Sequence, residues 1–162
     1  MLVGLLTALI VAILDQISKI MVYSYLLEVG KAVKVTSFFN LVSAWNTGVS
    51  FSMFNDLGGN GVYILSCFSL AVVSFLVYWL RKECSLYMKI SLGFVIGGAI
   101  GNVIDRLRQG AVYDFLDVHI GTHHWPAFNV ADSFICIGAV LIILDGIFLD
   151  KYNVSKKVEG VK

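Results

Sequence analysis

Two aspartates in largely apolar surroundings are the residues of this sequence best suited to acid–base chemistry. Asp114 lies in "AVYDFLDV", and Asp132 lies in "FNVADS", where the last long apolar run of the chain begins. Apolar neighbours favour the neutral form of a carboxyl group, which allows it to donate a proton to a substrate. Asp132 also has a structural interpretation, because an aspartate in the first turn of a helix is favoured by capping and by the helix dipole.

Two further groups of polar residues have spacings that place them on shared helix faces. Asp15 and Lys19 are four residues apart, so their charges can compensate each other, either as a structural ion pair or as part of a site. Asn102 and Arg106 have the same spacing, and Asp105 lies one step round the helix. Arg106 is suited to two roles, snorkelling to a membrane surface or binding carbonyl and lipid headgroup oxygens.

A metal site is the weaker interpretation of the histidines. His119, His123 and His124 follow the spacing H-x-x-x-H-H, which matches no familiar zinc signature. A serine–lysine hydrolase is also disfavoured, because Ser18 and Lys19 are neighbours that face different directions on a helix. We therefore predict neither a metal nor another cofactor for this chain.

The composition places these residues in a membrane protein. Of the 162 residues, 58% are hydrophobic and only 14% are charged, whereas about 25% of the residues of a typical soluble protein are charged. About 20 apolar residues are needed to cross the hydrocarbon core of a bilayer. Four stretches qualify, so we expect a single integral-membrane domain over residues 1–162, with spans at 2–24, 61–80, 86–106 and 130–149. The net charge of +1, without a basic stripe, argues against nucleic acid as a partner.

The segments between the spans are expected to form a small sheet at one membrane surface. The segments "KAVKV", "FFNLVSAW" and "VSFSMF" mix β-branched, aromatic and polar residues between turn signals, which predicts strands within about residues 30–56 and, by similar composition, 110–120. Lysines and arginines gather in the loop after the second span and in the C-terminal tail, which the positive-inside rule places in the cytoplasm. The polar ends of the first, third and fourth spans then converge on one external site.

Several motifs give the whole chain a resemblance to lipoprotein signal peptidase, the bacterial signal peptidase II family. They occur in the family order and are "DQISK", "NTGVSF", "GNVIDR", "VYDF" and "FNVADS". The sequence departs from the family pattern at Val49-Ser50, where two alanines are common, and this change touches no acid or base. The resemblance implies an all-α membrane protein of four transmembrane helices, with a small extracytoplasmic β-cradle and a short extracytoplasmic helix over the site.

The resemblance also implies an activity and a set of site residues. The activity is that of an aspartic-type endopeptidase, which removes the signal peptide from diacylglyceryl-modified prolipoproteins by cleaving before the lipidated cysteine. Motif position assigns catalysis to Asp114 and Asp132. The supporting or substrate-binding positions are Asp15, Lys19, Asn46, Gly48, Asn102, Asp105, Arg106, Asn129 and Ala131. The family further implies a monomer of the bacterial inner (cytoplasmic) membrane that contacts membrane lipids, needs no metal and is inhibited by globomycin-like peptides.

The acids themselves lead to the same pair. Three others that could reach the outer surface are poor candidates for proton transfer, namely Asp15, Asp105 and Asp117. The first has Lys19 one turn away and the second is next to Arg106, so both should be held ionised. The third should face away from Asp114 if the stretch is an extended strand. Asp114 and Asp132 remain, and their mutual repulsion should keep one proton between them near neutral pH.

Two other functions fit the bare composition less well. A small transporter or proton-conducting bundle would need polar groups along the full membrane depth, but the second span has none besides hydroxyls and Cys67. A phospholipid-modifying enzyme lacks support, because the sequence shows neither a phosphate-binding glycine motif nor an acidic metal cluster.

We predict that both termini and the loop at 81–89 are cytoplasmic, whereas residues 25–60 and 107–129 lie outside, because the basic residues gather in the loop and the tail. Single cysteines introduced at Asn60 and Lys157 should therefore react with a thiol reagent from opposite sides of the membrane. Reaction of both from the same side would contradict this topology.

Overall fold

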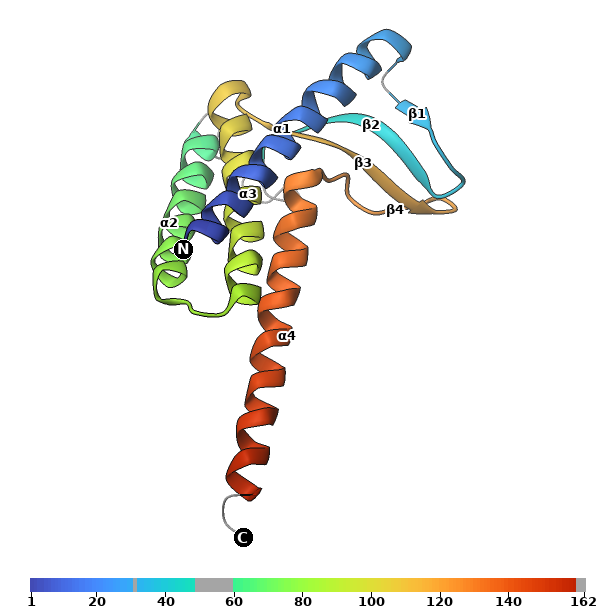
Figure 1. Cartoon of the computed structure of the whole chain (residues 1–162). Coiled ribbons are helices and arrows are strands. Elements are labelled where there is room, and N and C mark those ends of the chain that lie inside the picture. Colours follow the sequence, from blue (N-terminus) through green and yellow to red (C-terminus); the bar gives the residue numbers. More distant parts are fainter. Residues whose placement is uncertain (31, 49–59, 160–162) are drawn as a thin grey trace.

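All four predicted spans are helices in the computed structural model, which describes residues 1–30, 32–48 and 60–159 (Figure 1). The helices are α1 (Leu2–Val29), α2 (Asn60–Lys82), α3 (Leu86–Gln109) and α4 (Val130–Glu159). Each contains a stretch long and apolar enough to cross a membrane, so the prediction of four transmembrane helices is confirmed. All four helices run past the predicted ends of their spans, because a helix continues into polar surroundings until its terminal backbone groups find other partners.

Local sequence sets both ends of α3. The hydroxyl of Ser85 caps its first turn by accepting a hydrogen bond from the backbone N–H of Met88 at 3.3 Å. Gly110 ends the helix with φ of 72°, and its N–H donates to the carbonyl of Arg106 at 3.0 Å. A glycine suits this position because it has no Cβ to oppose a positive φ. The chain then enters the sheet two residues later, at Val112.

A four-stranded antiparallel sheet lies beyond one end of the bundle (Figure 1). Its strands, in both spatial and chain order, are β1 (Ala32–Lys34), β2 (Phe39–Asn46), β3 (Val112–Ile120) and β4 (His123–His124). The pairing of β2 with β3 sets Asn46 opposite Val112 and Ala44 opposite Asp114. This register brings the end of β2 next to the start of β3, where the third helix delivers the chain.

The predicted sheet is confirmed in both regions where it was expected, before α2 and after α3. The segment "VSFSMF" and the Val49-Ser50 departure fall within residues 49–59, outside the described part of the chain. Within the described ranges there is no helix besides the four long ones, so the short extracytoplasmic helix stays a prediction.

α3 is the central helix, because it packs against each of the other three. Glycines allow these approaches: a Cβ at Gly97 would collide with the carbonyl of Ala8 on α1, and a Cβ at Gly98 would collide with the carbonyl of Ala131 on α4. The two neighbours therefore lie close against adjacent faces of α3, near the middle of the helix. α4 continues well past the other helices at the end away from the sheet (Figure 1).

The burial of apolar side chains fits a bundle surrounded by lipid. Leu80, Leu92 and Ile96 are fully buried between the helices. Large apolar side chains on the outward faces, such as Phe68 and Ile143, are more than half exposed. Such exposure is costly in water and favourable in a hydrocarbon environment.

Candidate active site

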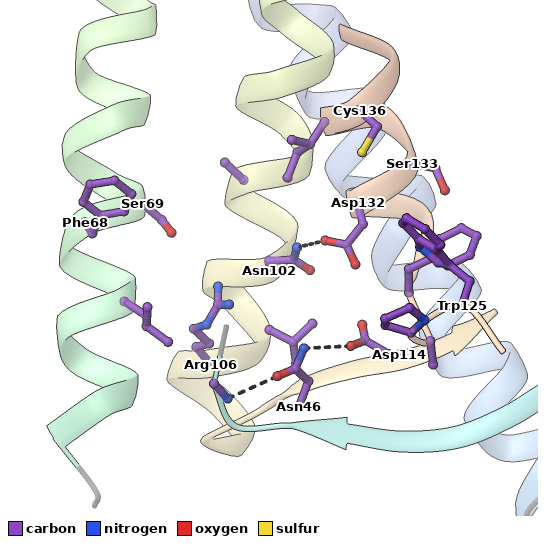
Figure 2. Close-up of a pocket in the computed structure, with 18 residues that line it drawn as sticks. Asn46, Phe68, Ser69, Asn102, Arg106, Asp114, Trp125, Asp132, Ser133 and Cys136 are labelled. Carbon is purple, nitrogen blue, oxygen red and sulfur yellow. Dashed lines mark hydrogen bonds between the residues drawn. The ribbon is translucent and has the colours of Figure 1, made fainter. Parts of the chain in front are cut away.

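A cavity of about 700 Å³ opens at the sheet end of the bundle, between α2, α3 and α4 (Figure 2). Its wall is mainly apolar and includes Leu65, Phe68, Trp125, Phe128 and Ile135. Charged and amide side chains reach it from four separate segments, and they are Asn46, Asn102, Arg106, Asp114 and Asp132. A largely apolar cavity with a few convergent polar groups is typical of a binding or active site.

Both aspartates assigned to catalysis line this cavity. Asp114 comes from β3 and is only 2% exposed, whereas Asp132 lies in the first turn of α4. Asn46, at the end of β2, donates a hydrogen bond to Oδ2 of Asp114 at 3.1 Å (Figure 2). Asn102, on α3, donates to Oδ1 of Asp132 at 2.7 Å. The structure thus brings together two acids and two amides that are far apart in the sequence.

Asn129 joins the two acids through its side chain. Its Nδ2 donates to Oδ1 of Asp114 at 2.7 Å, while its Oδ1 accepts the backbone N–H of Asp132 at 2.9 Å. In return, Oδ2 of Asp132 accepts the backbone N–H of Asn129 at 3.2 Å. This reciprocal pair of hydrogen bonds is a capping box. The capping interpretation of Asp132 is therefore correct, and it occupies one carboxylate oxygen while the other accepts from Asn102.

A buried ion cluster holds the helices together next to the cavity. Nζ of Lys19 lies 2.7 Å from Oδ2 of Asp15 and 2.7 Å from Oδ2 of Asp105. The predicted pair of Asp15 with Lys19 is confirmed, and Asp105 has the same Lys19 as its contact cation, in addition to the nearby charge of Arg106. Successive residues of a helix point about 100° apart, so Asp105 faces α1 while Arg106 lines the cavity.

The remaining hydrogen of the Lys19 ammonium orients Asn102. Nζ donates to Oδ1 of Asn102 at 3.1 Å, and Nδ2 of Asn129 donates to the same oxygen at 3.2 Å. Because the oxygen and nitrogen of an amide point in different directions, two donors on Oδ1 leave Nδ2 to face Asp132. Lys19 therefore determines which group of Asn102 meets the acid.

Asp114 is an acid whose surroundings favour a retained proton. Burial raises the pKa of Asp114, and the negative charge of Asp132 raises it further, so that it reaches about 6. The hydrogen bonds from Asn46 and Asn129 oppose this rise, as does the charge of Lys19. The unperturbed pKa of this group is 3.8, so the expectation that the neutral form of Asp114 is favoured is confirmed in direction.

Asp117 points away from the cavity, as the alternation along a strand predicts. Its carboxylate accepts a hydrogen bond from Asn40 at 2.7 Å and contacts Nδ1 of His124 at 2.8 Å. Burial by itself would raise the pKa of Asp117, but the hydrogen bonds from Asn40 and His124 outweigh it and lower the pKa.

The histidines do not gather into a metal site within the described part of the chain. The rings of His119 and His124 stack with centroids 4.7 Å apart, and the described residues include no group of three that could hold a metal ion.

The other supporting positions are Gly48, Ala131 and Arg106, which either donate a backbone hydrogen bond or line the cavity. Gly48 lines the cavity, and its N–H donates to Oδ1 of Asn46 at 3.1 Å. Ala131 is fully buried, and its N–H donates to Oδ1 of Asp15 at 2.8 Å. Within the described part of the chain, the buried Nε of Arg106 has no hydrogen-bond partner, so this guanidinium keeps donors for another molecule.

Gln16 is a contact residue that sequence reasoning missed. Its Nε2 donates to Oδ1 of Asp105 at 2.8 Å, across the interface of α1 with α3. The available signal was a polar amide within an apolar span, directly beside Asp15 in "DQISK".

The four membrane-spanning helices and the small sheet match the fold of known membrane-embedded enzymes. Two solved structures with the same fold are each described as a bacterial membrane enzyme studied by the in meso method. The one at 2.3 Å resolution has a TM-score of 0.77 and 30% sequence identity, and the match covers 93% of this chain and 90% of that one. The one at 1.9 Å resolution has a TM-score of 0.72 and 31% identity, with 88% and 90% covered.

Sequence comparison gives the particular family. The model of the family described as signal peptidase (SPase) II matches residues 7–148. A lipoprotein signal peptidase from Janthinobacterium sp. (strain Marseille) is 48% identical over 139 residues, which cover 85% of this chain and 84% of the relative. A lipoprotein signal peptidase from Aeromonas hydrophila is 44% identical over 146 residues, which cover 89% and 87%. The chain belongs to the signal peptidase II family.

Replacing Lys19 with methionine should strongly destabilise the protein. The change keeps the side-chain length but leaves the carboxylates of Asp15 and Asp105 without their cation, and loss of one partner from a buried ion pair costs about 3–5 kcal/mol. We expect a clearly lower melting temperature in detergent. Lys34→Met is the matched control, because Lys34 is exposed on β1. Equal melting temperatures for the two variants would contradict a structural role for the ammonium group.

Proposed function

We propose that the protein is an aspartic endopeptidase that removes the signal peptide from diacylglyceryl-modified prolipoproteins and cuts before the lipidated cysteine. The observation that carries the proposal is the placement of Asp114 and Asp132 in one apolar-walled cavity, where each accepts a hydrogen bond from an asparagine amide. The substrate class follows from the name shared by the relatives, lipoprotein signal peptidase.

Hydrolysis by this pair uses one carboxyl group as an acid and the other as a base. Asp114, with a pKa of about 6, is the group that starts with the proton. Asp132 takes a proton from water, whose oxygen attacks the carbonyl carbon of the scissile bond. Asp114 then donates its proton to the leaving nitrogen as the carbon–nitrogen bond breaks. The products are a new carboxyl terminus and a free amino group on the cysteine, and proton transfer from Asp132 to Asp114 restores the pair.

The cavity suits a substrate that is part lipid and part peptide. Its apolar wall includes side chains of α2 and α4, so acyl chains beside these helices stay in lipid while the peptide bond reaches the acids. The guanidinium of Arg106 lines the same cavity and suits carbonyl or headgroup oxygens. We infer that the cavity lies near the outer leaflet of the bacterial inner membrane, with both termini in the cytoplasm. Globomycin-like peptides would compete for this cavity, and the enzyme would act as a monomer.

The direct test is to incubate the purified protein with a lipidated prolipoprotein and to follow its mobility on a gel. Release of the signal peptide gives a faster-migrating product. The same precursor without the diacylglyceryl group is the matched control and should be processed poorly. A folded protein that leaves the lipidated precursor intact would reject the proposed function.

Asp114→Asn and Asp132→Asn should each lower turnover by orders of magnitude while the protein stays folded. Asparagine keeps the shape of the side chain but removes its acid–base chemistry. The double variant should be little worse than either single one, because residues that act as a unit are not additive. Asp117→Asn is the control from the opposite face of β3 and should lose less. Near-normal cleavage by a folded Asp114 or Asp132 variant would reject the pair.

The pH dependence should follow Asp114 and respond to its neighbour Asn46. We expect kcat/KM to fall as the pH rises through about 6, because Asp114 then loses its proton. Asn46→Ala removes a hydrogen bond that favours the ionised form, so the pKa of Asp114 rises and the fall moves to higher pH. Asn40→Ala is the matched control, because Asn40 also lies on β2 and donates the corresponding hydrogen bond to Asp117. It should leave the pH dependence of kcat/KM unchanged. An unmoved or acid-shifted profile for the Asn46 variant would contradict this assignment.

A further inference from the structure

The backbone just before each acid is held by the same buried cluster. The N–H of Tyr113 donates to Oδ2 of Asp105 at 3.2 Å, and the N–H of Ala131 donates to Oδ1 of Asp15 at 2.8 Å. These two residues directly precede the two proposed catalytic acids. The separation of the two cluster carboxylates therefore controls the separation of the two backbone segments that carry the acids.

Two side chains of α1 link these cluster carboxylates. Lys19 joins them through its ammonium group, at 2.7 Å from each. Gln16 makes the second link, because its Nε2 donates to Oδ1 of Asp105 at 2.8 Å and lies 3.2 Å from Oδ2 of Asp15. The same nitrogen lies 3.3 Å from the carbonyl oxygen of Gly101 on α3. Gln16 thus ties α1 to α3 at the level of the cluster.

A neutral donor fits this second link better than a charged group. All three N–H groups of Lys19 are already used, on the two carboxylates and on Asn102, while Oδ1 of Asp105 still needs a donor. A carboxylate at position 16 would place a third negative charge beside one ammonium group. An amide supplies two hydrogens without changing the charge of the cluster.

We propose that Gln16 is a positioning residue that sets the separation of the two catalytic acids through Asp15 and Asp105. It is not among the described residues that line the cavity, so it acts through the cluster rather than on the substrate. The inference rests on the proposed function, because it concerns the geometry of the acid pair.

Gln16→Met tests this role, because methionine keeps the length of the side chain and removes the donor. We expect kcat on a lipidated prolipoprotein to fall about ten- to a hundredfold, as for a displacement of about 1 Å at a reacting group, with KM changed by less than about twofold. Ser18→Ala is the matched control, because among the described residues the Ser18 hydroxyl bonds only to the carbonyl of Asp15 in its own helix. It should keep the kcat of the unmodified protein.

The pH profile separates positioning from a merely structural role. The charged groups that act on Asp114 are Asp132 from α4, Lys19 from α1 and Arg106 from α3, and Gln16→Met retains all of them. If the acids move apart, their repulsion weakens and the fall in activity at high pH should shift to lower pH. A variant with lower melting temperature but unchanged kcat and profile per folded molecule would overturn the proposal.

If the methionine variant does not fold, Gln16→Glu provides a second test of the positioning role. At low pH the new carboxyl group is neutral and donates a hydrogen bond to Asp105, whereas at higher pH it adds repulsion beside Asp15 and Asp105. Its turnover relative to the unmodified protein should therefore fall as the pH rises, and a constant ratio would overturn the proposal. Failure of the proposed function has a different signature, which is full activity of Asp114→Asn with Gln16 unchanged.

Discussion

One ammonium group shared by two buried carboxylates is the interaction on which the sheet end of the molecule depends. In surroundings of low dielectric, Lys19 compensates the buried carboxyl groups of Asp15 and Asp105, because its Nζ lies 2.7 Å from an oxygen of each. The carboxylates in turn accept backbone N–H groups from β3 and α4, and the third hydrogen of the ammonium group orients the amide of Asn102. One cation therefore fixes α1, α3, α4 and β3 in a single arrangement.

The start of α4 combines structure and chemistry in the same side chains. Asp132 uses Oδ2 to cap the helix and keeps Oδ1 for the amide of Asn102 at the cavity. Asn129 divides its amide in the same way, with the oxygen on the helix backbone and the nitrogen on Asp114. The capping and catalytic interpretations of this sequence are therefore compatible. Capping also makes the acid more rigid, because a helix terminus holds its carboxylate in one rotamer.

Features that depend on neighbouring residues could be predicted from the sequence, whereas contacts between elements could not. Hydrophobic runs gave the four helices, and the alternation along a strand gave the outward direction of Asp117. Asp105 shows where this reasoning ends, because its nearest cation in sequence is Arg106 but its partner in space is Lys19. That partner comes close only because the glycines of α3 admit α1. Gln16 was missed for the same reason, since the sequence around a single amide in an apolar helix does not indicate its hydrogen-bond partner, which lies on α3.

The environment of Asp114 balances two opposing requirements. Its carboxyl group has a pKa of about 6 in the folded protein against 3.8 unperturbed, so its contribution to stability is full below 3.8 and is lost as the pH rises through about 6. The amides of Asn46 and Asn129 limit this loss, because each donates to one oxygen of the carboxylate. A wholly apolar pocket would keep the proton too firmly for transfer, and a wholly polar one would release it too early. In the proposed mechanism Asp114 passes through both protonation states in each cycle, so the two amides that moderate the cost of ionisation would also support turnover.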